Sequence, residues 1–346
     1  MPERRALPDD GGGRGAASRM REVAQRAGVS PMTVSRALRD PTKVSEELRR
    51  RVEEAVRAVG YVPNRVAGNL SSMRSNVIGL IVPGLSNSLY APTIQGVSAV
   101  LRGSGFQLMI ADCGYSAEAE EELITAFLGQ RVAGLMLHDT RHTEAACGMI
   151  RRAGLPVVET GTLVPDPLDM LVSYSNHDAA RAMVMHLHRL GYRRIAFVSL
   201  PAANNDRSRE RRRGYRAALT ELGLEEDPRL VLEMPPGLAS GAEAVVRLLG
   251  GAAPPDAIFF AGDVLAAGAL FECQRRGWPV PGRVALAAFD DIDMLRHAVP
   301  PITTLRLPRE EIGRRSAEVL LDRIQGRSDE RVAVDLGFEI IQRGST

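Results

Sequence analysis

The amino-acid sequence predicts an α/β protein, with a small helical domain at the N-terminus followed by two doubly wound subdomains. Two observations predict this fold class. Residues 20–60 have the apolar spacing of three short helices, and from residue 77 onward short apolar runs alternate with amphipathic helical segments. Such alternation is typical of parallel sheets covered by helices on both faces. Residues 76–346 are too many for one open sheet, which favours two subdomains with a cleft between them, although a single eight-unit barrel remains an alternative.

The composition is that of an ordinary soluble globular protein: of 346 residues, 45% are hydrophobic and 25% are charged. The three cysteines, Cys113, Cys147 and Cys273, are far apart and show no C-x-x-C spacing, which argues against a disulfide framework or a structural zinc site. We expect a cytoplasmic protein, because no apolar run is long enough to span a membrane and residues 1–18 form a Gly-rich leader without the apolar core of a signal peptide.

The net charge of +2 hides an uneven distribution of charge along the chain. Residues 1–75 contain 15 Lys and Arg against 9 Asp and Glu, whereas the remainder contains 29 against 33. A basic N-terminal region joined to a mildly acidic body indicates that only this region meets a polyanion. All but one of the 44 basic residues are arginine, so a codon bias toward arginine stays an alternative explanation.

The stretch AGVSPMTVSRAL at residues 27–38 joins the first two predicted helices. Gly28 permits a tight turn, Ser30 is a good N-cap, and Pro31 suits the first helical position. The second helix has a narrow apolar face and an exposed face of small polar and basic side chains. Two helices in this arrangement form a helix-turn-helix motif whose second helix enters the major groove of DNA, the alternative being an ordinary helical hairpin.

The exposed face of that second helix carries groups that suit DNA. Arg36 suits guanine, Met32 offers an apolar contact, and Thr33 and Ser35 suit phosphate or base contacts. In this domain, the residues predicted to contact DNA are Ser30, Pro31, Met32, Thr33, Ser35 and Arg36.

Polar side chains follow the predicted strands of the body, and ligands collect beyond the carboxyl ends of parallel strands. On one later helix, Arg211 lies one turn before Tyr215 on the apolar stripe, so it should point toward the cleft and anchor an anionic ligand. The alternatives are a structural role for Arg211 and helix capping for the aspartates. The predicted strands are 77–82, 107–111, 132–137, 155–160, 194–199, 256–261 and 283–289, and the predicted ligand contacts are Ser86, Asn87, Tyr90, His138, Arg211, Asp263 and Asp290.

The segments REVAQRAGVSPMTVSRAL and VSEELRRRVEEAVRAVGYVPNRVA resemble the DNA-binding headpiece of LacI/GalR-type bacterial transcription regulators, almost continuously over residues 21–67. The resemblance continues at lower density through the body, in GLPVVE, HLHRLGYRRIAFVS, ERRRGY, AFDD and PPITTLRLP. Within the family, the segment 82–90 and the stretches HDTRHT and FECQRRG are most similar to gluconate-operon repressors.

The resemblance implies a homodimer in which each headpiece contacts one half-site of operator DNA. It also implies a body that resembles periplasmic sugar-binding proteins and holds a small effector. Asn64, Arg65 and Ala67 match the hinge helix of the family, and Leu70 matches the leucine that this helix inserts into the minor groove. The cost of unstacking bases for such a wedge is offset by contacts that the bent DNA allows.

The resemblance also places Arg211, Asp263 and Asp290 at family positions that contact effectors, and sugar hydroxyls are natural partners for the two carboxylates. We therefore predict a sequence-specific DNA-binding transcription regulator, a repressor, whose operator affinity is controlled by a sugar or a sugar acid such as gluconate. The alternatives are a sugar-binding transport-type protein and an α/β enzyme. No nucleophile–base pattern, P-loop or third ligand beside His138 and His142 supports an enzyme, a cofactor or a metal site.

The expected domain organisation has a headpiece, a hinge and a two-part body. No leucine heptads follow the body, which favours a dimer over a tetramer built by a coiled coil. The expected boundaries are a disordered leader at 1–18, the headpiece at 19–62, the hinge helix and linker at 63–75, and an effector-binding and dimerisation body at 76–346, with an N-subdomain at 76–173 and 306–328 and a C-subdomain at 174–305 and 329–346.

Overall fold

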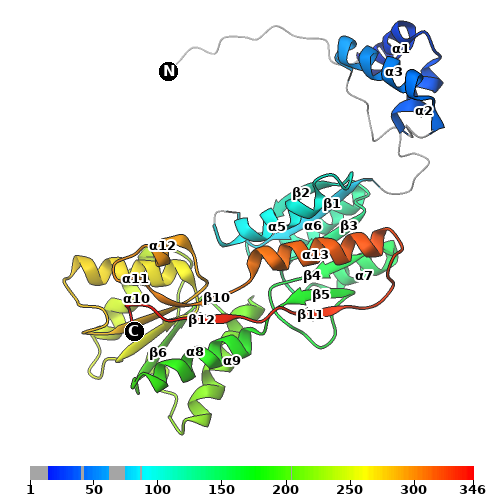
Figure 1. The fold of residues 1–346 in the computed structure, drawn as a ribbon. Helices are drawn as coiled ribbons and strands as arrows, with labels where there is room; N and C mark the ends of the chain where they lie inside the picture. Colours follow the sequence, from blue (N-terminus) through cyan, green and yellow to red (C-terminus); the bar gives the residue numbers. More distant parts are fainter. Residues whose placement is uncertain (1–14, 40–42, 62–74, 86–87, 204) are drawn as a thin grey trace, which may run out of the picture. The chain divides into compact units, whose positions relative to one another are not determined.

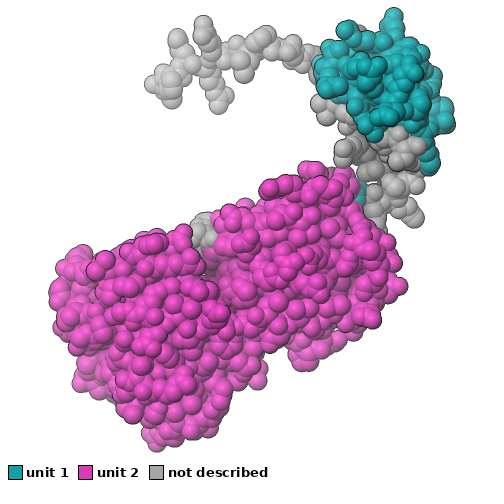
Figure 2. Space-filling model, viewed as in Figure 1, with its two compact units in different colours: residues 1–75 teal, residues 76–346 magenta. Residues whose placement is uncertain are grey.

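The structure is a computed structural model in which the chain forms two compact units, residues 1–75 and residues 76–346. Figure 2 colours them separately, and we call them the headpiece and the body. Within the described part of the chain, no helix is both long and apolar enough to cross a membrane. The residues that the structure describes are 15–39, 43–61, 75–85, 88–203 and 205–346.

Three helices, α1 (Gly15–Ala27), α2 (Pro31–Arg39) and α3 (Glu46–Val59), form the headpiece around a small apolar core (Figure 1). The hydroxyl of Ser45 caps the start of α3, and Gly60 ends it in the left-handed conformation with a φ of 63°. A capping hydroxyl and a C-terminal glycine satisfy the unpaired backbone groups at the two ends of this helix.

The first helix is longer than predicted. It begins at Gly15 rather than at residue 20, so the expected leader ends four residues earlier than residue 18. Alanine has the highest helix propensity, and the two alanines that follow Gly15 allow the helix to extend in this direction.

The body contains two six-stranded open sheets, and this confirms a doubly wound pair over a single barrel. All pairings are parallel except one, at the edge of the second sheet. In spatial order the first sheet has β11 (Ala333–Asp335), β5 (Met170–Ser173), β4 (Val157–Glu159), β3 (Gly134–Leu137), β1 (Val77–Val82) and β2 (Gln107–Asp112). The second has β12 (Glu339–Ile341), which is antiparallel to its neighbour, β10 (Thr303–Arg306), β9 (Ala285–Phe289), β8 (Ala257–Phe260), β6 (Ile195–Ser199) and β7 (Val231–Glu233).

Helices cover the two sheets, and the central strands are buried throughout, as their continuous apolar sequences predict (Figure 1). Beside the first sheet lie α5 (Ala91–Leu101), α6 (Ala117–Gly129), α7 (Glu144–Ala153) and α13 (Arg309–Ile324). Beside the second lie α8 (Asn176–Arg189), α9 (Asp206–Glu221), α10 (Leu238–Leu249), α11 (Asp263–Arg275) and α12 (Asp293–Arg296), and two 3-10 helices are η2 (Ser88–Tyr90) and η3 (Pro228–Leu230).

In the described part of the body, the chain crosses between the two subdomains three times. It passes from β5 to α8, from β10 to α13, and from β11 to β12 (Figure 1). The last crossing corrects the expectation that residues 329–346 belong wholly to the C-subdomain. Strand β11 pairs with β5 at the edge of the first sheet, and only then does the chain reach the second sheet as β12.

Each sheet reverses its strand order at one point, between β1 and β3 in the first sheet and between β6 and β8 in the second. Loops that leave neighbouring strands toward opposite faces of a sheet open a crevice beyond the carboxyl ends of those strands. The segments that follow these four strands carry Tyr90, His138, Asn205 and Asp263. The fold therefore places these side chains where a small ligand binds in doubly wound proteins.

All seven apolar runs that we predicted as strands contain one: β1, β2, β3, β4, β6, β8 and β9. The remaining five strands, β5, β7, β10, β11 and β12, were not predicted. Each of these is only three or four residues long, which is too short for periodicity to distinguish a strand from a loop.

Helices α5 and α13 pack backbone against backbone. A Cβ atom at Gly96 of α5 would lie 2.0 Å from the carbonyl oxygen of Glu310, and one at Gly313 of α13 would lie 2.0 Å from the carbonyl oxygen of Thr93. A side chain at either position would force the helices apart, so glycine is required at both. This contact holds α13, and with it the crossing that follows β10, against the first subdomain.

We expect Gly96→Ala to lower the free energy of unfolding by about 2–3 kcal/mol, because the added methyl group overpacks a backbone contact. Urea denaturation followed by circular dichroism measures the change. Gly129→Ala near the end of α6 is the matched control, since a Cβ atom there meets nothing within 4 Å and should leave stability unchanged or slightly increased. Equal losses in the two variants would contradict this packing argument.

Candidate functional site

The outer face of α2 carries residues that we predicted to contact DNA. Val34 and Ala37 are buried in the headpiece core, which leaves the opposite face of the helix to solvent. On that face Met32 is 74% exposed, and Pro31 and Arg36 are exposed as well. A large exposed apolar side chain beside an arginine is unfavourable in water but suits contact with base edges and thymine methyl groups.

A pair of hydroxyl groups fixes the start of α2. Ser30 Oγ accepts a hydrogen bond from the backbone N of Thr33 at 3.1 Å and lies 2.8 Å from Thr33 Oγ1. This confirms Ser30 as the N-cap. These two hydroxyls lie at the N-terminus of α2, where the helix dipole favours a phosphate group, and Ser35 in the second turn is partly exposed.

The turn before α2 is fixed by backbone geometry and by a side chain of α3. Gly28 has a φ of 66°, as its predicted role in the turn requires. The backbone N of Val29 donates to the carbonyl oxygen of Ala24 at 3.0 Å, and Arg51 of α3 donates to the carbonyl oxygen of Ala27 at 2.5 Å. These bonds fix the direction in which α2 leaves the turn, and therefore the direction of its exposed face.

The other predicted contacts divide into two groups. Five line a single cavity of the body with a volume of about 40 Å³, which we call the inner pocket: Tyr90, His138, Arg211, Asp263 and Asp290. Six lie outside the described residues, so their roles stay predictions: Asn64, Arg65, Ala67, Leu70, Ser86 and Asn87.

The inner pocket lies between the two subdomains, at the points where the strand orders reverse. Tyr90 and His138 follow strands of the first sheet, while Asp263 and Asp290 follow strands of the second. A cavity of about 40 Å³ holds only a few water molecules. The inner pocket is therefore too small for a ligand of hexose size in this structure, and its walls must move before such a ligand can bind there.

Arg211 is a buried cation whose hydrogen bonds go to neutral groups. Its Nε donates to Asn176 Oδ1 at 2.8 Å and its Nη1 donates to the carbonyl oxygen of Ala261 at 2.9 Å. The guanidinium carbon lies 3.6 Å from the ring centroid of Phe289. Among the described residues no carboxylate forms an ion pair with Arg211, which is 8% exposed. Because a buried charge without a counter-charge is costly, this position favours an anionic ligand.

Two carboxylates of the second subdomain line the same pocket. Asp290 has a φ of 75°, which aspartate tolerates better than most residues, and its Oδ1 lies 2.5 Å from Arg309 Nη2. Asp263 Oδ1 accepts a hydrogen bond from the backbone N of Val264 at 2.8 Å. Asp263 Oδ2 is buried without a partner among the described residues, and burial followed by the charge of Asp290 raises the pKa of Asp263 above its usual 3.8. This oxygen is free to bond a ligand hydroxyl.

His138 supplies a neutral hydrogen-bonding group to the inner pocket. Its Nδ1 lies 2.9 Å from Thr160 Oγ1, and its ring meets that of Tyr90 edge-on with 4.7 Å between ring centroids. Burial, followed by the charges of Arg207 and Arg309, lowers the pKa of His138 well below 6.5. The imidazole is therefore uncharged at neutral pH and adds no charge to the pocket.

Arg207 also lines the inner pocket, and sequence reasoning missed it. Its Nη1 donates to the carbonyl oxygen of His138 and to Asp139 Oδ1, both at 2.7 Å. The adjacent Asp206 accepts a hydrogen bond from Thr140 Oγ1 at 2.7 Å. The start of α9 thus holds the loop after β3 across the cleft. A signal was present, because Arg207 precedes Arg211 by one helical turn and so shares its face of the helix.

Arg309, the other missed residue of the inner pocket, had no such signal. It follows β10, a strand that the sequence did not reveal, and it pairs with Asp290 at the place where the chain returns to the first subdomain. Without that strand, nothing in the sequence places Arg309 beside the cleft.

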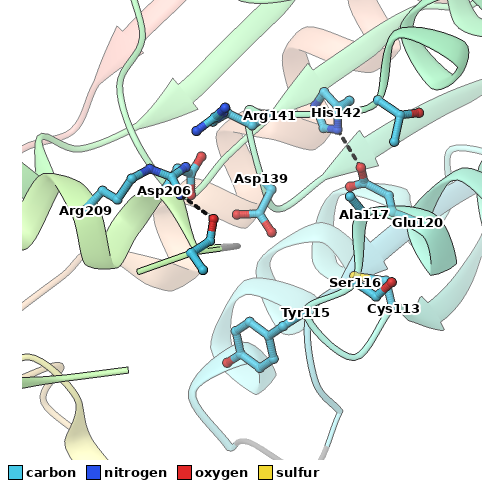
Figure 3. A pocket seen from close by; sticks show the side chains of 12 residues that line it. Cys113, Tyr115, Ser116, Ala117, Glu120, Asp139, Arg141, His142, Asp206 and Arg209 are labelled. Carbon is cyan, nitrogen blue, oxygen red and sulfur yellow. Dashed lines mark hydrogen bonds and ion pairs between the residues drawn. The ribbon is translucent and has the colours of Figure 1, made fainter. Parts of the chain in front are cut away.

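A second cavity, which we call the outer cavity, has a volume of about 190 Å³ (Figure 3). Its walls come from both subdomains and include Cys113 and Asp139 on one side and Asp206 and Arg209 on the other. Tyr115 lines both this cavity and the inner pocket, so the two are neighbours within one cleft.

His142 binds two glutamates. Its Nδ1 lies 2.6 Å from an oxygen of Glu120, an ion pair drawn in Figure 3, and its Nε2 lies 3.2 Å from an oxygen of Glu159. Burial alone would lower the pKa of His142, but the two glutamates outweigh it and raise this pKa to about 10. The protonated ring ties the loop that carries His138 to α6 and β4. No group of three side chains in the described ranges could hold a metal ion.

Comparison with known proteins gives a consistent result along the chain. Residues 19–64 match the family described as bacterial regulatory proteins, lacI family, and residues 184–346 match the periplasmic binding protein-like domain. The chain is 40% identical to the HTH-type transcriptional regulator GntR of Pseudomonas aeruginosa, over 94% of this chain and 95% of that protein.

Two solved structures are similar over nearly the whole chain. A LacI-family transcriptional regulator from Silicibacter pomeroyi superposes with a TM-score of 0.86 at 33% identity, covering 94% of this chain and 98% of that one. The lac repressor dimer bound to operator and the anti-inducer ONPF superposes with a TM-score of 0.81 at 25% identity, covering 94% and 97%.

We expect His142→Gln to cost about 3 kcal/mol of unfolding free energy at pH 6, because it leaves two buried carboxylates without their cation. The folded-state pKa lies above the unfolded value of 6.5, so this contribution is fully present below pH 6.5 and is lost as pH rises toward about 10. Urea titrations of both proteins between pH 6 and pH 9.5 measure the difference. The control is His177→Gln, at a partly exposed histidine of α8, whose unfolding free energy should differ little from that of the wild type at every pH. If the loss of unfolding free energy caused by His142→Gln instead grew with pH, the ion pairing of His142 with the two glutamates would be refuted.

Proposed function

Because this chain belongs to the lacI family of bacterial regulatory proteins, we propose that it is a homodimeric repressor whose affinity for operator DNA is set by a sugar acid. Members of this family regulate transcription by binding DNA, and the chain is a DNA-binding transcription regulator rather than an enzyme. A transport-type role is disfavoured by the same headpiece match. Gluconate is our leading candidate for the effector, and we place the protein in the cytoplasm, where a bacterial regulator meets its operator.

The uncompensated charge of Arg211 carries the proposal of an acidic effector. In the inner pocket Arg309 is paired with Asp290 and Arg207 with Asp139, whereas Arg211 has only neutral partners among the described residues. A ligand carboxylate would complete a third ion pair at this position. A neutral sugar would leave the buried guanidinium of Arg211 without a counter-charge.

The remaining groups of the inner pocket suit a chain of hydroxyl groups. Asp263 offers a carboxylate oxygen without a partner among the described residues, and neutral His138 offers an imidazole nitrogen. A carboxylate oxygen accepts a hydrogen bond from a hydroxyl, and a neutral imidazole can accept or donate one, so neither contact requires a charge on the ligand. An acid bearing several hydroxyls, as an aldonate does, would therefore use both the cation and its neighbours.

Control of DNA binding would come from the coupling of ligand binding to cleft geometry. The inner pocket is too small for a hexose-sized molecule in this structure, so effector binding would move its walls, which come from both subdomains. A ligand shifts an equilibrium only by its difference in affinity for the two states. Effector binding would thus change the fraction of dimers that present both headpieces correctly to the operator.

Exposed apolar side chains of the second subdomain support a dimer interface. Phe271 of α11, Met294 of α12 and Val299 in the following loop are 41%, 48% and 76% exposed. Gln274, one turn after Phe271, donates from Nε2 to the carbonyl oxygen of Val299 at 2.5 Å, which brings the two segments together. An apolar patch of this kind favours self-association through a two-fold axis.

We expect gluconate to raise the thermal midpoint of the wild type and to leave that of Arg211→Met unchanged, since the variant lacks the uncompensated cation. Differential scanning fluorimetry over a series of gluconate concentrations measures this. Arg213→Met on the same helix is the matched control, because Arg213 is exposed and pairs with Glu210, and it should respond like the wild type. An unchanged wild-type midpoint with every sugar acid tested would discredit the anionic effector.

We expect Arg36→Ala to weaken binding to the preferred duplex by about tenfold or more, because a guanidinium contact to guanine contributes about 1–3 kcal/mol of discrimination. The duplex is first selected by the wild type from a random pool, and affinities are then measured by fluorescence anisotropy at several salt concentrations, which should weaken binding. Arg50→Ala is the control, because Arg50 lies on α3 and pairs with Glu54, and it should bind nearly normally. Failure to enrich any palindromic sequence would contradict operator recognition.

A further inference from the structure

The outer cavity has a charge balance that the inner pocket lacks. Six ionisable side chains line it, three acidic and three basic; the two glutamates beside His142 raise its pKa to about 10, while burial raises the pKa of Asp139, which pairs with Arg207, to about 7. Because neither sign of charge dominates this lining, a neutral ligand fits it without leaving a further buried charge unpaired. The six side chains are Glu120, Asp139, Asp206, Arg141, His142 and Arg209.

The walls of the outer cavity supply both acceptors and donors of hydrogen bonds. Glu120 uses one carboxylate oxygen for His142, and Asp139 extends into the middle of the cavity in Figure 3. Arg141 forms no ion pair within the described ranges, and Arg209 of α9 uses one nitrogen for backbone carbonyl groups of the preceding loop. Sugar hydroxyls can donate to the carboxylates and accept from the guanidinium groups at the same time.

The size and position of the outer cavity match one sugar ring. An engineered cavity of about 150 Å³ holds a benzene ring, so the volume of about 190 Å³ suits one six-membered ring with substituents. Tyr115 lines both cavities, and the ion pair between Arg207 and Asp139 lies between them. A ligand that occupied both would place its acid against Arg211 and a neutral extension beside Asp139.

We propose that the outer cavity is a second subsite, which takes a neutral, hydroxyl-rich ring attached to the sugar acid. The preferred effector would then be an aldonic acid that carries a sugar, rather than the free aldonic acid. This inference rests on the proposed function, because the inner pocket must hold the acid end. With this second subsite, the effector would also be bound by residues of the loop after β2, of α6 and of the start of α9.

The test compares free gluconate with gluconate that carries glucose on O4 through an α link (maltobionate) or a β link (cellobionate). Isothermal titration calorimetry on the full-length protein gives the affinities. We expect at least one glycosylated acid to bind about tenfold more tightly than gluconate, a difference of about 1.4 kcal/mol. Ala117→Leu, which fills the outer cavity and removes no charge, should abolish this advantage and change the affinity for gluconate less than about twofold.

Ala126→Leu is the matched control, because Ala126 is an exposed residue of the same helix and does not line either cavity. It should leave both affinities unchanged. If gluconate binds but neither glycosylated acid binds more tightly, or if the advantage survives Ala117→Leu, the second subsite is refuted and the proposed function stands. If none of the three acids binds to the wild type, both proposals fail together.

Discussion

A buried charge requires a counter-charge, and this constraint governs how the two subdomains of the body meet. Arg207 and Arg309 are buried in the cleft, and each pairs with a carboxylate from the facing subdomain, Asp139 and Asp290 respectively. Closure therefore neutralises charges that separation would leave unpaired or return to water. Arg211 is the exception among the three, since its described partners are neutral. The same constraint accounts for the ion pairs that join the two subdomains across the cleft, and it is the basis for proposing an anionic ligand.

The headpiece differs from the body in this respect, because its polar and cationic side chains are exposed on the surface and need no buried counter-charge. Its core is small, and α2 contributes little more than Val34 and Ala37 to it. Stability comes instead from the packing of α1 on α3 and from the hydrogen bond of Arg51 to the end of α1. The outer face of α2 is therefore free of any packing role, so its side chains can suit a particular base sequence at no cost to the fold.

The sequence predicted what local patterns determine. Capping residues and apolar spacing placed the three headpiece helices, and continuous apolar runs placed the central strands of both sheets. Because ligands bind beyond the carboxyl ends of parallel strands, we expected Tyr90, His138, Asp263 and Asp290 to lie together, and they line one cavity. Five short strands were not predicted, three at sheet edges and two, β5 and β10, inside the sheets, since the stability of such strands comes from pairing with distant segments. Arg309 was likewise not predicted as a residue of the inner pocket, because its position depends on a crossing between subdomains that no local pattern encodes.

The late crossing from β11 to β12 has a consequence for the synthesis of the chain. The first sheet begins at β1 and the second at β6, yet each acquires an edge strand only from residues after 332. Until these residues have been synthesised, β5 and β10 are the exposed edge strands of their sheets, and exposed edges are sites of mispairing between nascent chains. Residues 333–341 therefore complete the strand order of both sheets, so neither sheet is complete before this segment has been synthesised.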